Sequence, residues 1–189
     1  EIKKLMKSLE ETRERLSENN FLLKAEIDMN EQKARFEEKN RLYDRIARDV
    51  SSQLIKAEEL LAHAKQNPEE AHNVLAKICV ISAYIKRRSN LLLLSEENKI
   101  ISSSELEFCL RESLDNIRLL GVHSSLKSRC SGNLDVENAV AVYDLFEKTV
   151  ELFIDDINAL MVSLKCENSV VKLNLQIGLN DGADISALD

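Results

Sequence analysis

Three histidines carry the side chains best suited to accept a phosphoryl group or a proton. His63, His72 and His123 each present an imidazole, whose ordinary pKa lies close to neutrality. None of them is followed directly by an acid that could orient the ring or accept its proton. We therefore expect exposed structural histidines, and we keep His63 and His72 as the alternative phosphate sites.

A second group of side chains could bind a divalent cation. Asp155, Asp156 and Asn158 lie close together near the end of a predicted helix and offer oxygen ligands. The same helix carries Glu151, and so many acids would repel a triphosphate unless a metal ion intervened. Because no complete ligand set can be recognised from the spacing, we predict no resident metal ion.

Very long helices must position these side chains. From Glu1 to Leu120 the sequence has no glycine and a single proline, Pro68, and apolar residues recur with spacings of three and four. We expect a first helix from about Glu1 to Asn67, roughly 100 Å long at the usual rise per residue. A helix of this length cannot bury its apolar stripe alone.

The apolar stripe follows a heptad repeat, with charged residues on the remaining faces. Its seam consists of Ile2, Leu5, Leu9, Leu16, Asn20, Leu23, Ile27, Asn30 and Ala34. The two asparagines would have to pair across a partner helix, which lowers stability but fixes the register and the number of strands. We predict a parallel homodimeric coiled coil.

After Ala34 the phase of the repeat slips before the pattern resumes. The second part of the seam consists of Leu42, Ile46, Val50, Leu54, Ala57 and Leu61. An insertion of three or four residues in a heptad array locally changes the supercoil. We therefore expect the second half of the helix to pack differently, as a rod entering a helical bundle would.

A turn at residues 66–70 ends the first helix and begins a second. Asn67 is suited to cap the new helix, Pro68 to occupy its first position, and two acids follow in the first turn. The second helix is expected to reach about Leu94. The two helices form a hairpin, and two hairpins pair into a dimeric four-helix bundle.

The pattern then changes to a small α+β unit. Ser104 and Glu107 fit a capping box that opens a helix over 105–120, which Gly121 can end in the left-handed conformation. A short strand and a loop over 122–134 precede a helix over 136–158. Alternating apolar residues over 160–179, with a turn at 167–169, predict a C-terminal β-hairpin.

Composition and charge exclude several classes of protein. The formal net charge is −7, and residues 131–189 carry 3 basic against 11 acidic side chains, which argues against nucleic acid as a partner.

The four cysteines, Cys79, Cys109, Cys130 and Cys166, lack the short spacings of a zinc site, and we expect reduced, mostly buried thiols. The sequence contains no membrane span or signal peptide, and its start at Glu1 within a heptad suggests a fragment.

Several segments resemble the transmitter core of a bacterial sensor histidine kinase of low-GC Gram-positive type. Such a core has a helical hairpin for dimerisation and phosphotransfer, followed by an ATP-binding domain. The resemblance runs from Arg41 to the end of the chain and is carried by the segments at 45–54, 84–94, 112–118, 142–158 and 180–182.

The chain departs from this family at the positions that perform its chemistry. Arg48, followed by Asp49, stands where the phosphoacceptor histidine would be, and a guanidinium cannot act as a nucleophile. The resemblance implies ATP and Mg²⁺ at Glu151, Asp155, Asn158 and Asp181, if the chain binds a nucleotide at all. The glycine-rich loop that closes on phosphate is missing, so we expect no cofactor in this chain.

The sequence therefore predicts a mainly α protein in three parts. A signalling coiled coil spans 1–40, a helical hairpin dimerisation domain 41–95, and a small α+β domain like a truncated ATP-binding domain 96–189. We expect the dimeric cytoplasmic transmitter region of a membrane-anchored, histidine kinase-like protein, without its own phosphoacceptor histidine and with impaired ATP binding. The membrane would be reached only through upstream segments. An active kinase that uses an unusual histidine, and a purely structural coiled-coil scaffold, are the alternatives.

The expected partners are a second copy of the chain and a response regulator or another signalling protein. The basic run Lys86-Arg87-Arg88 could dock such an acidic partner, such as a receiver domain, or lie near anionic lipid. A solvated helix face is the interpretation that we favour for this run, because a charge run on a helix usually forms its outer face.

Overall fold

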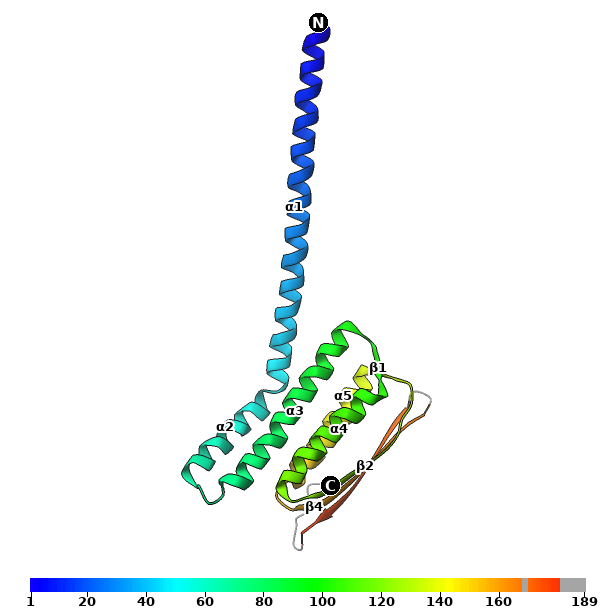
Figure 1. Ribbon diagram of the computed structural model, residues 1–189. Helices are drawn as coiled ribbons and strands as arrows, with labels where there is room; N and C mark the ends of the chain where they lie inside the picture. The colour runs from blue at the N-terminus through cyan, green and yellow to red at the C-terminus, as the bar shows by residue number, and fades with distance from the viewer. Residues whose placement is uncertain (168–169, 181–189) are drawn as a thin grey trace. The chain divides into compact units, whose positions relative to one another are not determined.

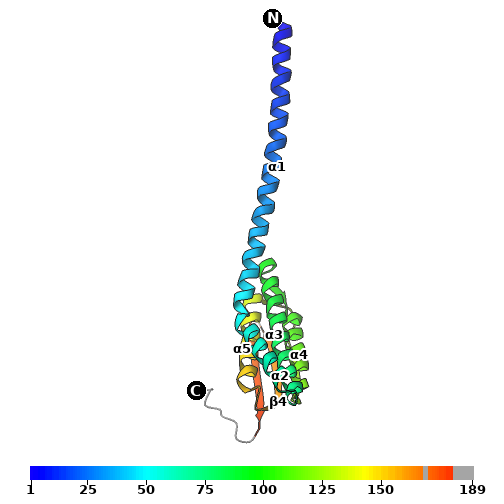
Figure 2. The ribbon, with the colours of Figure 1, turned by 90° about the vertical axis from the view of Figure 1, so that its left-hand side faces the viewer.

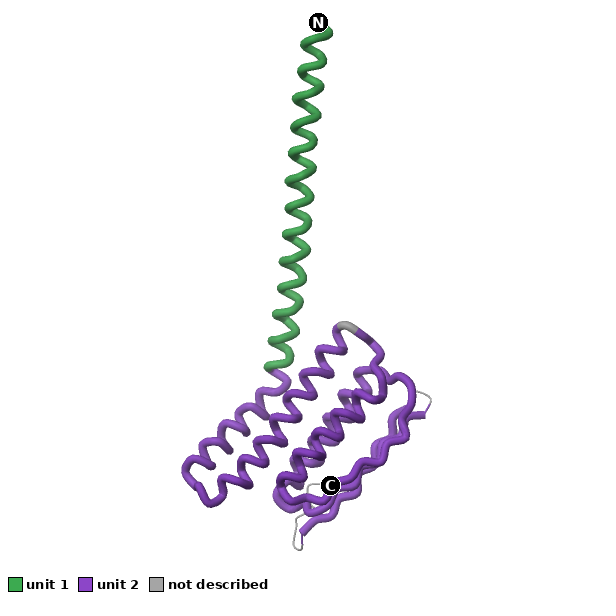
Figure 3. Tube along the Cα trace, in the orientation of Figure 1, with its two compact units in different colours: residues 1–47 green, residues 48–189 purple. Residues whose placement is uncertain are grey.

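The structure, a computed structural model, describes residues 1–167 and 170–180. The chain divides into two compact units, residues 1–47 and residues 48–189, which Figure 3 distinguishes by colour. Each unit is described by itself below. No helix in the described part of the chain combines the length and the apolar character needed to cross a bilayer.

The first unit consists of one helix. Helix α1 (Ile2–Asp49) has 48 residues and continues without interruption past Ala34, where the heptad phase slips. It is the long blue helix of Figure 2. None of its residues is buried, and the seam leucines Leu9, Leu16 and Leu23 expose more than half of their surface. The coiled coil and its second copy therefore stay predictions.

The first helix ends earlier than the sequence predicts. The backbone turns at Val50, and helix α2 (Ser51–Gln66) begins directly after it. The Ser51 hydroxyl donates to the carbonyl oxygen of Arg48 at 2.7 Å and so satisfies one acceptor that the broken helix leaves free. Val50 itself is buried, with 3% of its surface exposed. Burial of this valine accompanies the break, which no glycine or proline marks.

The turn of the hairpin also differs from its prediction. Asn67 ends α2, where its backbone N–H donates to the carbonyl oxygen of His63 at 3.0 Å, instead of capping the next helix. Residues 68–70 form the turn, and helix α3 (Ala71–Glu97) starts three residues later than expected. The helical hairpin itself is present, with α2 packed against α3.

Two further helices follow the hairpin. Helix α4 (Ser103–Ile117) is capped by Ser102, whose hydroxyl accepts from the backbone N–H of Ser104 at 3.3 Å. The capping box predicted at Ser104 is therefore wrong, and Glu107 instead pairs with Arg111. A 3₁₀ turn, η1 (Arg118–Leu120), ends at Gly121. This glycine has the left-handed conformation, with a φ of 81°, as predicted.

Helix α5 (Val136–Phe153) is shorter than predicted, and this changes the setting of Asn158. The chain turns at residues 154–156, so Asn158 lies in a strand and not on the helix with the acids. The apolar residues Val150, Phe153, Ile154 and Ile157 keep helical spacing across this turn. That spacing explains why the sequence pattern places the end of the helix too late.

The strands form two small sheets. Strand β1 (Ile100–Ser102) pairs antiparallel with β3 (Asn133–Asp135). In the larger sheet β2 (His123–Arg129) runs parallel to β4 (Ile157–Glu167), and β4 pairs antiparallel with β5 (Val170–Leu179). The predicted C-terminal hairpin is confirmed. Its turn residues 168 and 169 lie outside the described residues.

Residues 48–189 form three layers around one core, which Figure 1 shows as the α2–α3 hairpin, then α4 and α5, then the larger sheet. The hairpin contributes Val80, Tyr84 and Leu91 to the same core as Phe146 of α5 and Val162 of β4. The boundary expected near residue 95 therefore does not separate two compact units. The hairpin is instead continuous with the α+β part.

One pair of cysteines is joined. Cys130, directly after β2, forms a disulfide with Cys166 of the neighbouring parallel strand β4, and their Cα atoms are 4.6 Å apart. The expectation of reduced thiols is wrong for this pair, because the parallel register of β2 and β4 brings together two residues that lie 36 positions apart in the sequence. Cys109 is buried and free, as expected, whereas Cys79 is free but exposed.

Candidate functional site

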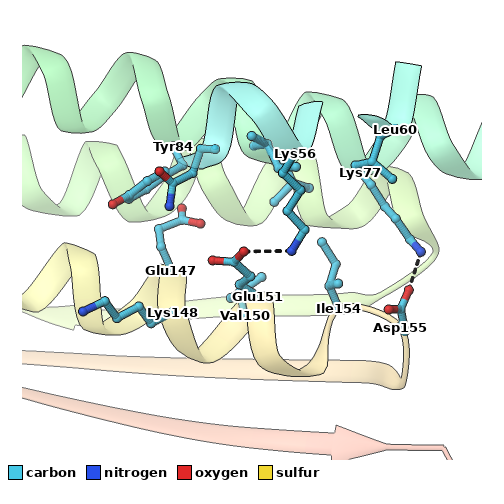
Figure 4. A pocket seen from close by; sticks show the side chains of 13 residues that line it. Lys56, Leu60, Lys77, Tyr84, Glu147, Lys148, Val150, Glu151, Ile154 and Asp155 are labelled. Atoms are coloured by element: carbon cyan, nitrogen blue, oxygen red, sulfur yellow. Dashed lines mark hydrogen bonds and ion pairs between the residues drawn. The ribbon is translucent and has the colours of Figure 1, made fainter. Parts of the chain in front are cut away.

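A cavity of about 200 Å³ lies between the hairpin and helix α5 (Figure 4). Five of its lining side chains are aliphatic, namely Leu60 of α2, Val80 and Ile81 of α3, Val150 of α5 and Ile154 directly after α5. Gln53, Tyr84, carboxylates and lysines line the rest of it. Glu151 and Asp155, two of the predicted cofactor-binding residues, are among them, so the structure brings both into one site.

Glu147 is the carboxyl group of this cavity that the sequence analysis missed. Only 7% of the residue is exposed, and burial raises the pKa of its carboxyl group to about 7. Ser113 opposes this shift, because its hydroxyl donates to Glu147 Oε1 at 2.6 Å and also lies 2.8 Å from the hydroxyl of Tyr143. Glu147 can therefore gain or lose a proton near neutral pH without leaving the core.

Glu151 and Asp155 are each neutralised by a lysine of the hairpin. Lys56 Nζ of α2 lies 2.7 Å from Glu151 Oε1, and Lys77 of α3 pairs with Asp155, as the dashed lines in Figure 4 show. Both pairs are partly exposed, and such pairs contribute little to stability. Their consequence here is chemical, because a carboxylate that already holds an ammonium group is poorly placed to bind Mg²⁺.

The other predicted cofactor ligands do not join this cavity. Asn158 is exposed in β4, where its side-chain amide donates to Asn180 Oδ1 at 3.3 Å. Asp156 uses its backbone oxygen to accept from Asn180, and Asp181 lies outside the described residues. The part of the chain that the structure describes contains no cluster of three or more His, Cys, Asp or Glu side chains suited to a metal ion.

Asp49, the acid at the predicted phosphoacceptor position, belongs to a partly buried charge network. Arg88 of α3 places Nη1 3.1 Å from Asp49 Oδ2, and its Nε and Nη2 donate to the two carboxylate oxygens of Asp144 of α5 at 2.9 and 3.1 Å. The hydroxyl of Tyr84 donates to Asp144 Oδ1 at 3.2 Å. Arg48, beside Asp49, is exposed.

This network is held by a permanent cation. Burial alone would lower the pKa of Arg88, but its hydrogen bonds to Asp144 and Asp49 outweigh burial and raise it. Burial and the charge of Asp144 raise the pKa of Tyr84. The basic run at 86–88 is the one sign of this network in the sequence, and nothing in the pattern identifies Asp144 as the partner of Arg88.

Docking of an acidic partner is the alternative interpretation of the same run, beside the favoured solvated helix face. Lys86 and Arg87 both pair with Glu112 of α4, and the guanidinium of Arg87 also lies over the ring of Phe108, 4.3 Å from its centroid. All three basic residues of the run are thus engaged within the fold. This arrangement disfavours the run as a docking surface.

The three histidines are exposed, as expected. His63 of α2 does have polar neighbours at the hairpin turn, because its Nε2 lies 3.2 Å from Asn67 Nδ2 and 3.9 Å from Glu70 Oε2. The acid seven residues away faces the imidazole because the chain folds back there. Glu70 does not directly follow His63 in the sequence, so the sequence pattern did not identify this acid.

Comparison with known proteins does not assign a family. No protein-family model matches the chain, and no curated protein matches it. A solved structure described as "1.7 Angstrom Structure of a Bacterial Phosphotransferase" matches with a TM-score of 0.44 and 11% sequence identity. The match covers 72% of this chain and 64% of that one, which is less than two thirds of that chain's length. The resemblance to histidine kinases stays a prediction from the sequence.

Proposed function

We propose that this chain is the dimeric transmitter region of a sensor histidine kinase-like signalling protein. In this proposal two copies pair through the heptad seam of α1, and the chain has no phosphoacceptor histidine at Arg48 and binds ATP poorly. It would act in the cytoplasm as the soluble part of a membrane-anchored protein. Its work would be to pass a conformational change from the helical rod to the α+β part.

The ion-pair network around Arg88 is the observation that supports this proposal best. Asp49 is the last residue of α1, and Arg88 connects it to Asp144 of α5 by three hydrogen bonds. A shift of Asp49 would therefore change the forces on α5. Because Arg88 binds the two acids through separate donors, a displaced Asp49 would either move the guanidinium or lose its hydrogen bond to it. These two outcomes are the alternative arrangements that a transmitting element needs.

A cross-linking experiment tests the transmission. Leu16→Cys, in a Cys79→Ser background to remove the exposed thiol, would lock the seam upon oxidation, and hydrogen exchange would be followed in 136–153. We expect the lock to change exchange there by about threefold or more, and Arg88→Met to abolish the change. Arg111→Met, which breaks a surface pair, is the matched control. An unchanged α5 in the locked protein would contradict the proposal.

Weak nucleotide binding has its own test. Because Lys56 and Lys77 occupy Glu151 and Asp155, we expect isothermal titration with ATP and Mg²⁺ to give no saturable binding at micromolar ligand. Micromolar binding that is lost in Glu151→Gln would show that a nucleotide displaces the lysines. That result would favour a working ATP site.

The contact between His63 and Glu70 favours a second candidate, an active kinase with an unusual phosphate site. An exposed imidazole near a carboxylate can be held in one tautomer with a free nucleophilic nitrogen. Incubation with labelled ATP and Mg²⁺ would then give an acid-labile phosphate on the chain. Loss of the label in His63→Gln, but not in His72→Gln, would support this candidate over the first.

A further inference from the structure

The outward face of the larger sheet concentrates positive charge. Lys127 and Arg129 of β2, Lys165 of β4 and Lys172 of β5 are all exposed and alternate with residues that point toward the core. We call these four residues the cationic face. Figure 1 shows the helices of this unit on the opposite side of the sheet.

Three of these charges stand in one row across the sheet. Arg129 is in register with Lys165 on the parallel neighbour, and Lys165 is in register with Lys172 on the antiparallel neighbour. Like charges directly opposite each other destabilise a sheet. Within the described residues none of the four forms an ion pair, and Glu167 is the one acid on the outward positions of these strands.

The row is unusual for this chain. The formal net charge is −7, and only 3 basic residues follow position 130, of which Lys165 and Lys172 lie on this face. Random placement of so few cations in an acidic region would leave them beside acids. Glu167 is the one acid beside this row among the described residues, so the repulsion within the row is offset only in part, and such a local cost is expected at functional surfaces.

The face is also hollowed and partly apolar. A shallow depression of about 860 Å³ is lined by Lys127, Lys165 and Lys172 and by Met161, and it reaches Leu145 of α5. Met161 exposes 38% of its surface and Leu145 exposes 57%. Methionine is adaptable in contacts, and an apolar centre beside a charged rim is typical of protein interfaces.

We propose that the cationic face is a docking surface for an acidic amphipathic helix of a partner protein. The row spans three strands, which is about 10 Å. Acids at positions i, i+4 and i+7 of a helix span about the same length along its axis. Apolar residues beside those acids would meet Met161, as in other complexes where a helix occupies a groove.

This occupant fits better than the other polyanions. A bilayer surface or a nucleic acid would meet the whole acidic molecule, whereas a single helix meets only the face where the charge is complementary. The inference does not depend on the proposed signalling function, because it uses only the register, charge and shape of the sheet.

A peptide titration tests the proposal. The probe is a short fluorescein-labelled helical peptide with glutamates at i, i+4 and i+7 and leucines beside them, and the control peptide has the same composition with its glutamates spread around the helix. By fluorescence anisotropy on the full chain, we expect the probe to bind about tenfold more tightly than the control and to weaken as salt rises. Equal binding of the two peptides, or none at low salt, would overturn the proposal.

Two variants of equal charge locate the site. Lys165→Glu with Lys172→Glu should weaken binding of the probe by about tenfold or more, and Lys65→Glu with Lys99→Glu, at exposed lysines elsewhere, should leave it nearly unchanged. Far-ultraviolet circular dichroism confirms that both variants fold. If phosphatidylserine vesicles or a single-stranded oligonucleotide bind the cationic face more tightly than the probe, the partner is not an acidic helix and the proposal is wrong.

Discussion

Residues 1–47 and residues 48–189 use apolar side chains in opposite ways. In the first unit no residue is buried in the single chain, and the seam leucines Leu9, Leu16 and Leu23 expose more than half of their surface. In the second, apolar residues of the hairpin, α4, α5 and the sheet converge on one core, where Phe146, Leu110 and Val162 have no exposed surface. The second unit buries its apolar side chains within a single chain, and the first does not.

This difference separates two sources of stability. The second unit folds by burying apolar surface against its own chain, so its unfolding should not depend on concentration. A helix with an exposed apolar seam gains the same stabilisation only from a partner, so its order should depend on concentration. Substitutions in the two units should therefore change different measurements.

The largest expected effect is on association. Leu16→Lys with Leu23→Lys places four charges in the seam of the predicted dimer, and we expect dissociation to become at least about a thousandfold more favourable. Sedimentation velocity over a concentration series measures this. Thermal unfolding of the 48–189 core should stay the same, and a lower midpoint for that transition would show that the comparison between the units is wrong.

The next effect falls on the core. Phe146→Ala removes a ring with 0% exposed surface and should lower the free energy of unfolding by about 3 to 5 kcal/mol. Phe21→Ala is the matched control, because Phe21 exposes 73% of its surface and lies off the predicted seam. Urea titration followed by circular dichroism compares the two. An equal loss of unfolding free energy in both variants would show that Phe21 is buried in the folded protein, contrary to its exposure in the single chain.

The disulfide should stabilise the second unit alone. Joining residues 36 positions apart is expected to contribute about 3 to 4 kcal/mol, which Cys130→Ser with Cys166→Ser would remove. Cys79→Ser serves as control, since Cys79 is exposed and free. The measurement is urea unfolding in the absence of reductant. In a reducing cytoplasm the two thiols would remain adjacent but unbonded, so wild-type protein with reductant should match the double variant.

The smallest predicted effect depends on pH. The folded state raises the pKa of Glu147 from its ordinary value of 4.5 to about 7, so it binds this proton more tightly than the unfolded chain does. The associated stability is complete below the lower value and is lost as the pH rises through the higher one, by about 3 kcal/mol. Unfolding of Glu147→Gln should lack this loss between pH 5 and pH 8. A wild-type profile with the opposite slope would contradict the burial of a proton-binding carboxyl group.

Periodicity in the sequence predicts the elements that bury one continuous face. The alternation over 160–179 predicts the β-hairpin, and the spacing of Leu106, Leu110 and Leu114 predicts α4. The ends of elements are less well predicted. The break at Val50 carries no glycine or proline, and Ile157 continues the helical spacing of α5 although it begins a strand.

The candidate site was only partly predictable, because it depends on pairs from distant segments. Glu151 and Asp155 could be identified on one helix, but the lysines that neutralise them come from α2 and α3. Glu147 occupies a position within the apolar pattern of α5, and only the packing against Ser113 and Tyr143 explains a carboxyl group there. The disulfide likewise follows from a parallel register that local patterns do not encode.

Sedimentation equilibrium of the unaltered chain at low micromolar concentration tests the central claim most directly. One chain has a mass of 21.5 kDa, and pairing through α1 predicts a particle of twice that mass, with the 48–189 core folded in each copy. A single-chain mass, with α1 still helical by circular dichroism, would contradict the claim that the exposed seam of residues 1–47 exists to bind a second copy.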